Sequence, residues 1–181
     1  MSPLRIVITG APGSGKTTCF ERLKTLPAFS GFVFFEELAR ELLIENPGYR
    51  HDKGEFHREI YRRHVVREQA IGNKPFISDR GSADAFAFHP ESAEDVGTTI
   101  AGEYARYTAI VHLGTSAALG ESYYFLDDVR DESVEQALAI ETAITNVWKD
   151  HPGYRFITAK EDFEDKYQDF LKTMTALVTT P

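Results

Sequence analysis

The chain has 181 residues, of which 42% are hydrophobic and 27% are charged, and its formal net charge is -8 at pH 7. These values are typical of one folded domain spanning residues 1–181, and they exclude a disordered chain. The acidic charge argues against a general nucleic-acid-binding protein, because phosphate backbones favour positively charged surfaces.

The sequence shows no sign of export or of membrane insertion. Cys19 is the single cysteine, so an internal disulfide is impossible and a reducing compartment is expected. The apolar run at 4–9 stops at Gly10 and is too short for a secretory signal. No segment reaches the length that a bilayer requires. We therefore expect a cytoplasmic protein without a membrane partner.

Short apolar runs alternate along the chain with longer segments of helical periodicity. In chain order we expect a strand at 4–9, a helix at 16–25, a strand at 32–35, helices at 36–45 and 55–71, strands at 75–79 and 109–113, a helix at 133–150, a strand at 154–158 and a helix at 162–177. This alternation predicts an α/β fold whose parallel sheet is covered by helices on both faces. Ligands of such sheets bind beyond the carboxyl ends of the strands.

A phosphate-binding loop follows the first expected strand. The stretch GAPGSGKT at 10–17 matches G-x-x-x-x-G-K-[ST] in full, with a strand before it and a helix after it. Glycines let the backbone turn tightly, so that successive N–H groups and the helix N-terminus face a phosphate. The residues expected to hold the nucleotide are Gly10, Gly13, Ser14, Gly15, Lys16, Thr17 and Thr18.

Within this loop, Lys16 is expected to reach the β- and γ-phosphate oxygens. The Thr17 hydroxyl is expected to ligate Mg²⁺, and Thr18 to donate to the α-phosphate. These roles predict ATP and Mg²⁺ as cofactors. The chain has no N-K-x-D element of the kind that often selects guanine, which favours ATP over GTP.

Asp79 and Arg80 form a second candidate site directly after the strand PFISD. A carboxylate at this position can hold Mg²⁺ or orient an attacking hydroxyl. A guanidinium can bind an anionic or hydroxyl-rich acceptor with its planar fork. The alternative interpretation is a helix N-cap aspartate beside a surface arginine.

The junction FFEELAR forms a third candidate site, with Glu36 and Glu37 followed by Arg40. Glu37 could take a proton from an acceptor hydroxyl. Two acids favoured by a helix N-terminus, with Arg40 paired to Glu37, are an equally good interpretation.

The stretch 121–131 is interpreted as a mobile loop that contains Asp127, Asp128 and Arg130. Arg130 on a closing lid could neutralise charge on a transferred phosphoryl group. The alternative is a solvated charge cluster, with Ser133 or Asp131 capping the next helix.

The arginines of REIYRRHVVRE are interpreted mainly as a solvated helix face with glutamate partners. One of them could instead reach an acceptor phosphate. His57, His64 and His89 show no spacing typical of metal ligands.

The segments ITGAPGSGKTT, FEELAR, ISDRG, YFLDDVRDE and GYRFIT together resemble the small AAA-domain proteins of the P-loop superfamily. These proteins are related to nucleoside and nucleotide kinases, among them thymidylate kinase and nicotinamide-riboside kinase. The resemblance implies a five-stranded parallel sheet of order 2-3-1-4-5 within three α/β/α layers, and MgATP or less often MgGTP as donor. It also implies that Asp79 and Arg80 lie on the acceptor side, that Arg130 belongs to the lid and that Ala159 and Lys160 pack on the nucleotide base.

The sequence thus predicts a small-molecule kinase, monomeric or homodimeric, that transfers the γ-phosphoryl group of MgATP to a nucleoside, a nucleotide or a similar hydroxylated acceptor. Its catalytic residues are expected to be Lys16, Glu37, Asp79, Arg80 and Arg130, with Thr17 and Asp79 as metal ligands. AAA+ motors normally carry a water-activating glutamate directly after the metal aspartate. This chain has Arg80 at that position, which argues against a dedicated hydrolase and for transfer to an acceptor. The alternative is a regulatory module that hydrolyses ATP or GTP slowly. The single arginine between Glu121 and Ser133 favours that alternative, because kinase lids often carry several.

Overall fold

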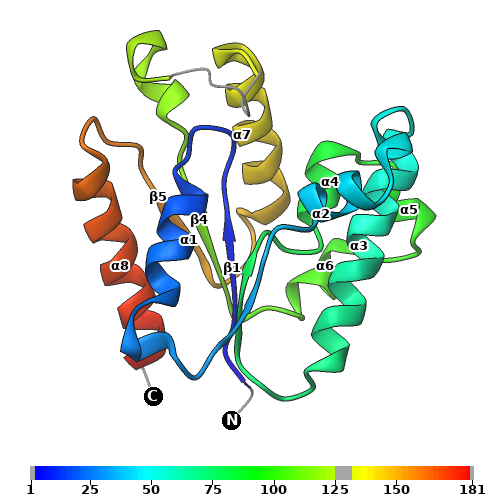
Figure 1. Cartoon of the computed structure of the whole chain (residues 1–181), viewed down its shortest axis with the longest axis horizontal. Helices are drawn as coiled ribbons and strands as arrows, with labels where there is room; N and C mark the ends of the chain where they lie inside the picture. Colours follow the sequence, from blue (N-terminus) through cyan, green and yellow to red (C-terminus); the bar gives the residue numbers. More distant parts are fainter. Residues whose placement is uncertain (1–2, 125–131, 180–181) are drawn as a thin grey trace.

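Five parallel strands form the centre of the molecule (Figure 1), whose computed structural model describes residues 3–124 and 132–179. The strands are β1 (Arg5–Thr9), β2 (Val33–Phe35), β3 (Phe76–Asp79), β4 (Ala109–Leu113) and β5 (Tyr154–Ile157). Their spatial order is β2-β3-β1-β4-β5, and every neighbouring pair is parallel. The predicted fold class and strand order are therefore confirmed.

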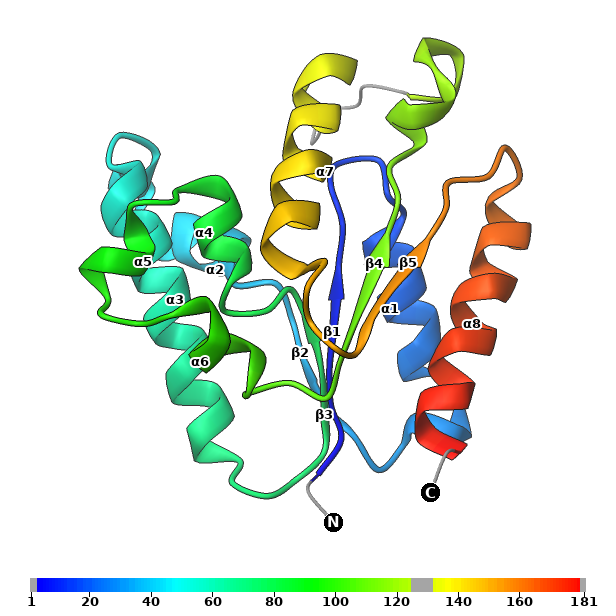
Figure 2. The same ribbon diagram turned by 180° about the vertical axis from the view of Figure 1, so that it is seen from behind.

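Helices cover both faces of this sheet. They are α1 (Lys16–Lys24), α2 (Leu38–Glu45), α3 (Lys53–Ala70), α4 (Asp84–Phe88), α5 (Ser92–Asp95), α6 (Ile100–Tyr104), α7 (Val134–Trp148) and α8 (Phe163–Thr179). Figures 1 and 2 show α1 and α8 on one side of the sheet and the remaining helices on the other. The sequence did not predict α4, α5 and α6, because helices of four or five residues are too short to show a helical period.

The strand β1 supplies both halves of the core because successive side chains point to opposite faces of a sheet. Ile6 and Ile8 pack toward α1 and α8, in one cluster with Phe170. Val7 lies between them in the sequence and packs toward α7, in a second cluster with Trp148. A strand buried on both faces must be apolar where it is buried, which explains the three apolar residues 6–8 between Arg5 and Thr9.

The parallel strands all end at the same edge of the sheet, and the candidate site residues follow those ends. Ile8 lies opposite Asp79 in the register of β1 with β3. Phe35 lies opposite Ser78 in the register of β2 with β3, so that Glu36 and Glu37 emerge beside Asp79. Figure 2 shows the loop after β1 and the segment after β4 at this same end of the molecule.

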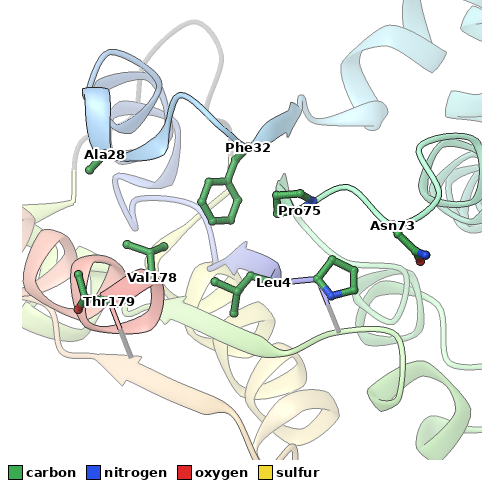
Figure 3. Close-up of a pocket in the computed structure, with 8 residues that line it drawn as sticks. Leu4, Ala28, Phe32, Asn73, Pro75, Val178 and Thr179 are labelled. Atoms are coloured by element: carbon green, nitrogen blue, oxygen red, sulfur yellow. The ribbon is translucent and has the colours of Figure 1, made fainter. Parts of the chain in front are cut away.

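The opposite end of the sheet carries a cavity of about 970 Å³, drawn in Figure 3. Its lining residues are Pro3, Leu4, Ala28, Phe32, Asn73, Pro75, Val178 and Thr179. None of these side chains is charged, and they offer no group for acid–base or phosphate chemistry. In the part of the chain that the structure describes, no helix has the length and apolar character needed to cross a membrane.

Candidate functional site

The phosphate-binding loop connects β1 to α1 at the carboxyl edge of the sheet. Gly13 and Gly15 have positive φ angles of 78° and 74°, and Gly15 is the N-cap of α1. Side chains with a Cβ rarely adopt this backbone conformation. A Cβ on Gly13 would also lie 2.7 Å from the ring of Tyr124, and one on Gly15 would collide with the ring of Phe163. Both glycines are therefore required by conformation and by space.

A cavity of about 300 Å³ lies directly over this loop. It is lined by residues 11–18, together with Glu37, Arg80 and Glu132. No side chain caps the N-terminus of α1, so its backbone N–H groups and the positive end of the helix dipole are available to an anion. The geometry fits a phosphate group.

Lys16, the first residue of α1, forms a buried ion pair with Asp79 at the end of β3. Its Nζ lies 2.5 Å from Asp79 Oδ1, and the two side chains are only 7% and 6% exposed. Burial raises the pKa of the Asp79 carboxyl, although the Lys16 ammonium opposes that rise. A phosphate oxygen that binds Lys16 must therefore compete with Asp79 for the ammonium group.

Arg80 is the one non-glycine residue with a positive φ, 67°, among residues 3–124 and 132–179. Its Nε donates to Glu37 Oε1 at 3.0 Å, and its guanidinium lies over the ring of Phe88 at 5.0 Å. Burial alone would lower the pKa of Arg80, but the carboxylates around it outweigh burial and raise it. Its Nη1 is buried, makes no hydrogen bond to any described residue and lies 3.9 Å from Asp84 Oδ1, so this donor is suited to an acceptor atom of a ligand.

The strained backbone at Arg80 is held by hydrogen bonds from both sides. Ser78 Oγ donates to the Arg80 carbonyl at 2.7 Å. The Asp84 carboxylate accepts from the Gly81 N–H at 2.6 Å and from the Thr9 hydroxyl at 2.5 Å. An arginine with a left-handed backbone conformation persists only where the surrounding structure holds it. These hydrogen bonds therefore maintain the strained turn at the site.

Glu37 lies between the phosphate cavity and a second cavity. The second cavity has a volume of about 440 Å³ and shares Thr17 and Glu37 with the first. Burial opposes ionisation of Glu37, but the charges of Lys16 and Arg80 prevail and lower its pKa. The partner of Glu37 is Arg80 and not Arg40, because no Glu37–Arg40 ion pair occurs among the described residues. The pairing of Glu37 with Arg40, which the alternative interpretation of this junction expected, is therefore wrong.

One arginine of α3 differs from its neighbours. Arg58, Arg62 and Arg63 form the expected ion pairs with acidic partners on the molecular surface. Arg67 is instead partly buried and donates to the Glu36 carbonyl at 2.7 Å and to Ser78 Oγ at 2.9 Å. A single guanidinium thus ties the turn after β2 to the end of β3. The sequence analysis assigned Arg67 to the solvated face of the helix, because helical spacing does not reveal which groups pack against a side chain.

Three aromatic and charged residues contact the phosphate-binding loop without any signal in the sequence. Tyr124 and Phe163 are the rings that pack against Gly13 and Gly15. Lys166 on α8 is 3% exposed and donates to the Ser14 carbonyl at 2.7 Å. A lysine within the charged segment EDFEDK gives no indication that it is buried.

Other residues singled out in the sequence have different placements. Lys160 pairs with Asp169 at 2.5 Å and lines a separate cavity beside β5. Ser133 caps α7 through a capping box with Gln136, as one interpretation of this segment expected. Arg130, with Asp127 and Asp128, lies outside the described residues.

The metal ligands expected at this site are oxygen atoms. Thr17 and Asp79 line the same cavity, and Mg²⁺ prefers a few protein oxygens together with phosphate oxygens and water. Within the described ranges, no group of three or more His, Cys, Asp or Glu side chains could hold a metal ion by itself. The oxygen atoms of Thr17 and Asp79 fit such an ion.

The fold and the loop together define a small P-loop protein of the three-layer α/β/α class. A family model described as an AAA domain matches residues 5–166, and the chain belongs to this family. The sheet order and flanking helices are those of the P-loop kinase fold.

Solved structures with the same fold include deoxyadenosine kinase from M. mycoides. Its structure with bound dATP has a TM-score of 0.61 and 13% identity, covering 94% of this chain and 98% of that one. Its structure with the product dCMP and a flexible dCDP has a TM-score of 0.58 and 14% identity, covering 96% and 100% of the two chains. No curated protein that was compared matches this sequence.

Proposed function

We propose that the protein is a small-molecule kinase that transfers the γ-phosphoryl group of MgATP to a hydroxyl of a nucleoside, a nucleotide or a similar acceptor. The observation that carries this proposal is the pair of adjoining cavities. One lies over the phosphate-binding loop, and the other shares Thr17 and Glu37 with it. A donor and an acceptor can thus meet beside Lys16 and Glu37.

On the donor side, the backbone N–H groups of Gly13 to Thr18 and the α1 N-terminus bind the phosphates. Lys16 exchanges its partner Asp79 for phosphate oxygens. Mg²⁺, held by Thr17 and Asp79, would neutralise charge on the β- and γ-phosphates. Gly10 provides the turn that leads from β1 into the loop.

On the acceptor side, Glu37 orients the attacking hydroxyl and takes its proton. Its lowered pKa keeps it ionised near neutral pH. Arg80 offers its Nη1, which makes no hydrogen bond within the described residues, to the acceptor. Arg130 is proposed to steady the transferred group from the lid. A nucleoside-type acceptor is supported by the fold shared with deoxyadenosine kinase.

The test is nucleotide consumption with MgATP and with MgGTP, each scanned against nucleosides, nucleoside monophosphates and small hydroxylated vitamins. Lys16→Ala is the blank. A compound that raises turnover tenfold or more, about 1.4 kcal/mol of barrier, and gains a phosphate establishes the kinase and its substrate class. Tight nucleotide binding with slow turnover across the whole panel contradicts it.

That second outcome would favour a nucleotide-dependent regulatory module. The observation in its favour is the residue after Asp79, which is Arg80 bound to Glu37 rather than a free water-activating glutamate. Slow hydrolysis would then alternate two forms of the loop, one with Lys16 on Asp79 and one with Lys16 on phosphate. A partner that binds only one of these forms would identify the module.

A further inference from the structure

Lys166 lies on the outer side of the phosphate-binding loop, where α8 runs beside α1 (Figure 1). Its Nζ donates to the Ser14 carbonyl at 2.7 Å and to the Gly114 carbonyl at 2.5 Å. The side chain is buried, and no carboxylate lies within ion-pair distance of it among residues 3–124 and 132–179. A buried ammonium without an anionic partner destabilises the fold, so a functional role is the better explanation for Lys166 at this position.

The electrostatic surroundings compensate this charge only in part. Burial lowers the pKa of Lys166 to about 8. The groups that interact with it are Cys19 on α1 and Glu141 on α7. Burial raises the pKa of the Cys19 thiol to about 11, so this group stays neutral. The Glu141 carboxylate is already engaged by the Thr115 N–H at 3.1 Å and by His112 Nε2 at 3.2 Å.

The hydrogen bond to Ser14 also fixes the direction of a peptide group. The C=O of Ser14 and the N–H of Gly15 belong to one trans peptide unit and point in opposite directions. Because the carbonyl faces Lys166, the Gly15 N–H points away from Lys166, and Gly15 lines the phosphate cavity. A proton on Lys166 thus polarises the N–H of a residue that lines this cavity.

We propose that Lys166 is a positioning residue of the phosphate site, whose protonated form holds the Ser14–Gly15 peptide in its binding orientation and adds a buried positive charge behind the loop. The inference rests on the proposed binding of a nucleoside triphosphate at this loop. The proposal gives α8 a role in phosphate binding that the loop motif alone does not predict.

The sign of the pH dependence follows from linkage. A bound triphosphate favours the charged form of Lys166 and raises its pKa above the value in the free protein. Triphosphate affinity is therefore greatest below about pH 8 and falls as the lysine loses its proton. If binding raises the pKa by one unit, the affinity falls about sixfold between pH 7.5 and 9.5.

The experiment is calorimetric titration of the full chain with MgATP at pH 7.5, 8.5 and 9.5. Phosphate monoesters complete their ionisation near pH 6, so the charge of ATP is constant over this range. We expect the wild-type affinity to fall about sixfold. Lys166→Met should bind more weakly at pH 7.5 and show little pH dependence. Lys166→Arg should keep its affinity at pH 9.5, because a guanidinium does not titrate there.

Lys172→Met is the matched control, since Lys172 is an exposed lysine on the same helix. It should keep the wild-type affinity and pH profile. A wild-type affinity that is constant from pH 7.5 to 9.5 overturns the proposal, as does an equal decline in Lys166→Arg. If Lys166→Met does not fold, the comparison of wild type with Lys166→Arg still decides. Absence of MgATP binding by the wild type at every pH would instead refute the nucleotide site itself.

Discussion

The donor half and the acceptor half of the site are built in different ways. The donor half is one continuous stretch, from Gly10 to Thr18, whose shape follows from its own glycines and from the helix that it starts. The acceptor half joins Glu37 to Arg80 across 43 positions of sequence, through turns that Arg67 and Asp84 hold in place. A local motif therefore shapes the proposed phosphate site, whereas tertiary packing determines which side chains lie opposite it.

The largest effect is expected where the two halves meet, at Lys16. Lys16→Ala removes the cation that binds the γ-phosphate, and turnover should fall at least 10²–10³-fold. It also leaves the buried Asp79 carboxylate without its partner, so the free energy of unfolding should fall as well. The measurements are turnover and urea unfolding. Lys24→Ala, on the same helix with exposed glutamate partners, should leave both unchanged.

Asp79→Asn should distinguish nucleotide binding by the donor half from phosphoryl transfer to the acceptor half. The asparagine no longer holds Lys16 by charge, which offsets the loss of a proposed Mg²⁺ ligand, so MgATP affinity should stay close to that of the wild type. Phosphoryl transfer should fall about 10²-fold, because a ligand of Mg²⁺ and an orienting carboxylate are lost. Affinity by calorimetry and transfer by product analysis test this pair of outcomes. Transfer at an undiminished rate would remove Asp79 from the mechanism.

Arg67→Met should disturb the acceptor half alone. The guanidinium that links the Glu36 carbonyl to Ser78 is lost, so Glu37 and Arg80 lose their common support. We expect transfer to fall about tenfold with MgATP affinity unchanged. Arg63→Met, one turn earlier on the helix, is the matched control, since Arg63 pairs with the exposed Glu45 and the partly buried Glu59. Equal loss of affinity and transfer in Arg67→Met would show that the two halves are not separable in this way.

The smallest effect concerns stability in acid. Burial lowers the pKa of His57 to about 4, and its ring stacks on Phe88 at 5.7 Å beside Arg80. The unfolded chain therefore binds more protons than the folded chain between pH 6.5 and pH 4, and stability falls as the pH falls through that window. Urea unfolding at pH 7 and pH 5.5 should show a loss of roughly 1 kcal/mol from this residue. The loss should be smaller in His57→Gln and unchanged in His51→Gln, an exposed neighbour.

The elements that the sequence predicted correctly are those with a strong local signal. All five strands and the helices of eight or more residues agree with the structure to within two residues at either end. The short helices between Asp84 and Tyr104 were missed because they carry no period of their own. They form by packing in the loop region after β3, and they bring Phe88 over Arg80.

The same distinction holds for the site. Glycines, Lys16 and Thr17 were recognised because spacing alone identifies a phosphate-binding loop. Arg67 and Lys166 were not, because a basic residue in a charged helix has the same appearance whether it is solvated or buried. The geometry around them decides their environment, and only the folded chain contains that geometry.

The left-handed backbone at Arg80 also bears on the stability of the fold. A side chain in that conformation destabilises the fold by about 1–3 kcal/mol, and glycine would relieve most of the strain. Glycine would also lose the ion pair with Glu37 and the contact with the ring of Phe88. The strain is therefore the cost of holding a guanidinium at this place, and Arg80→Gly would exchange that strain for an unpaired Glu37.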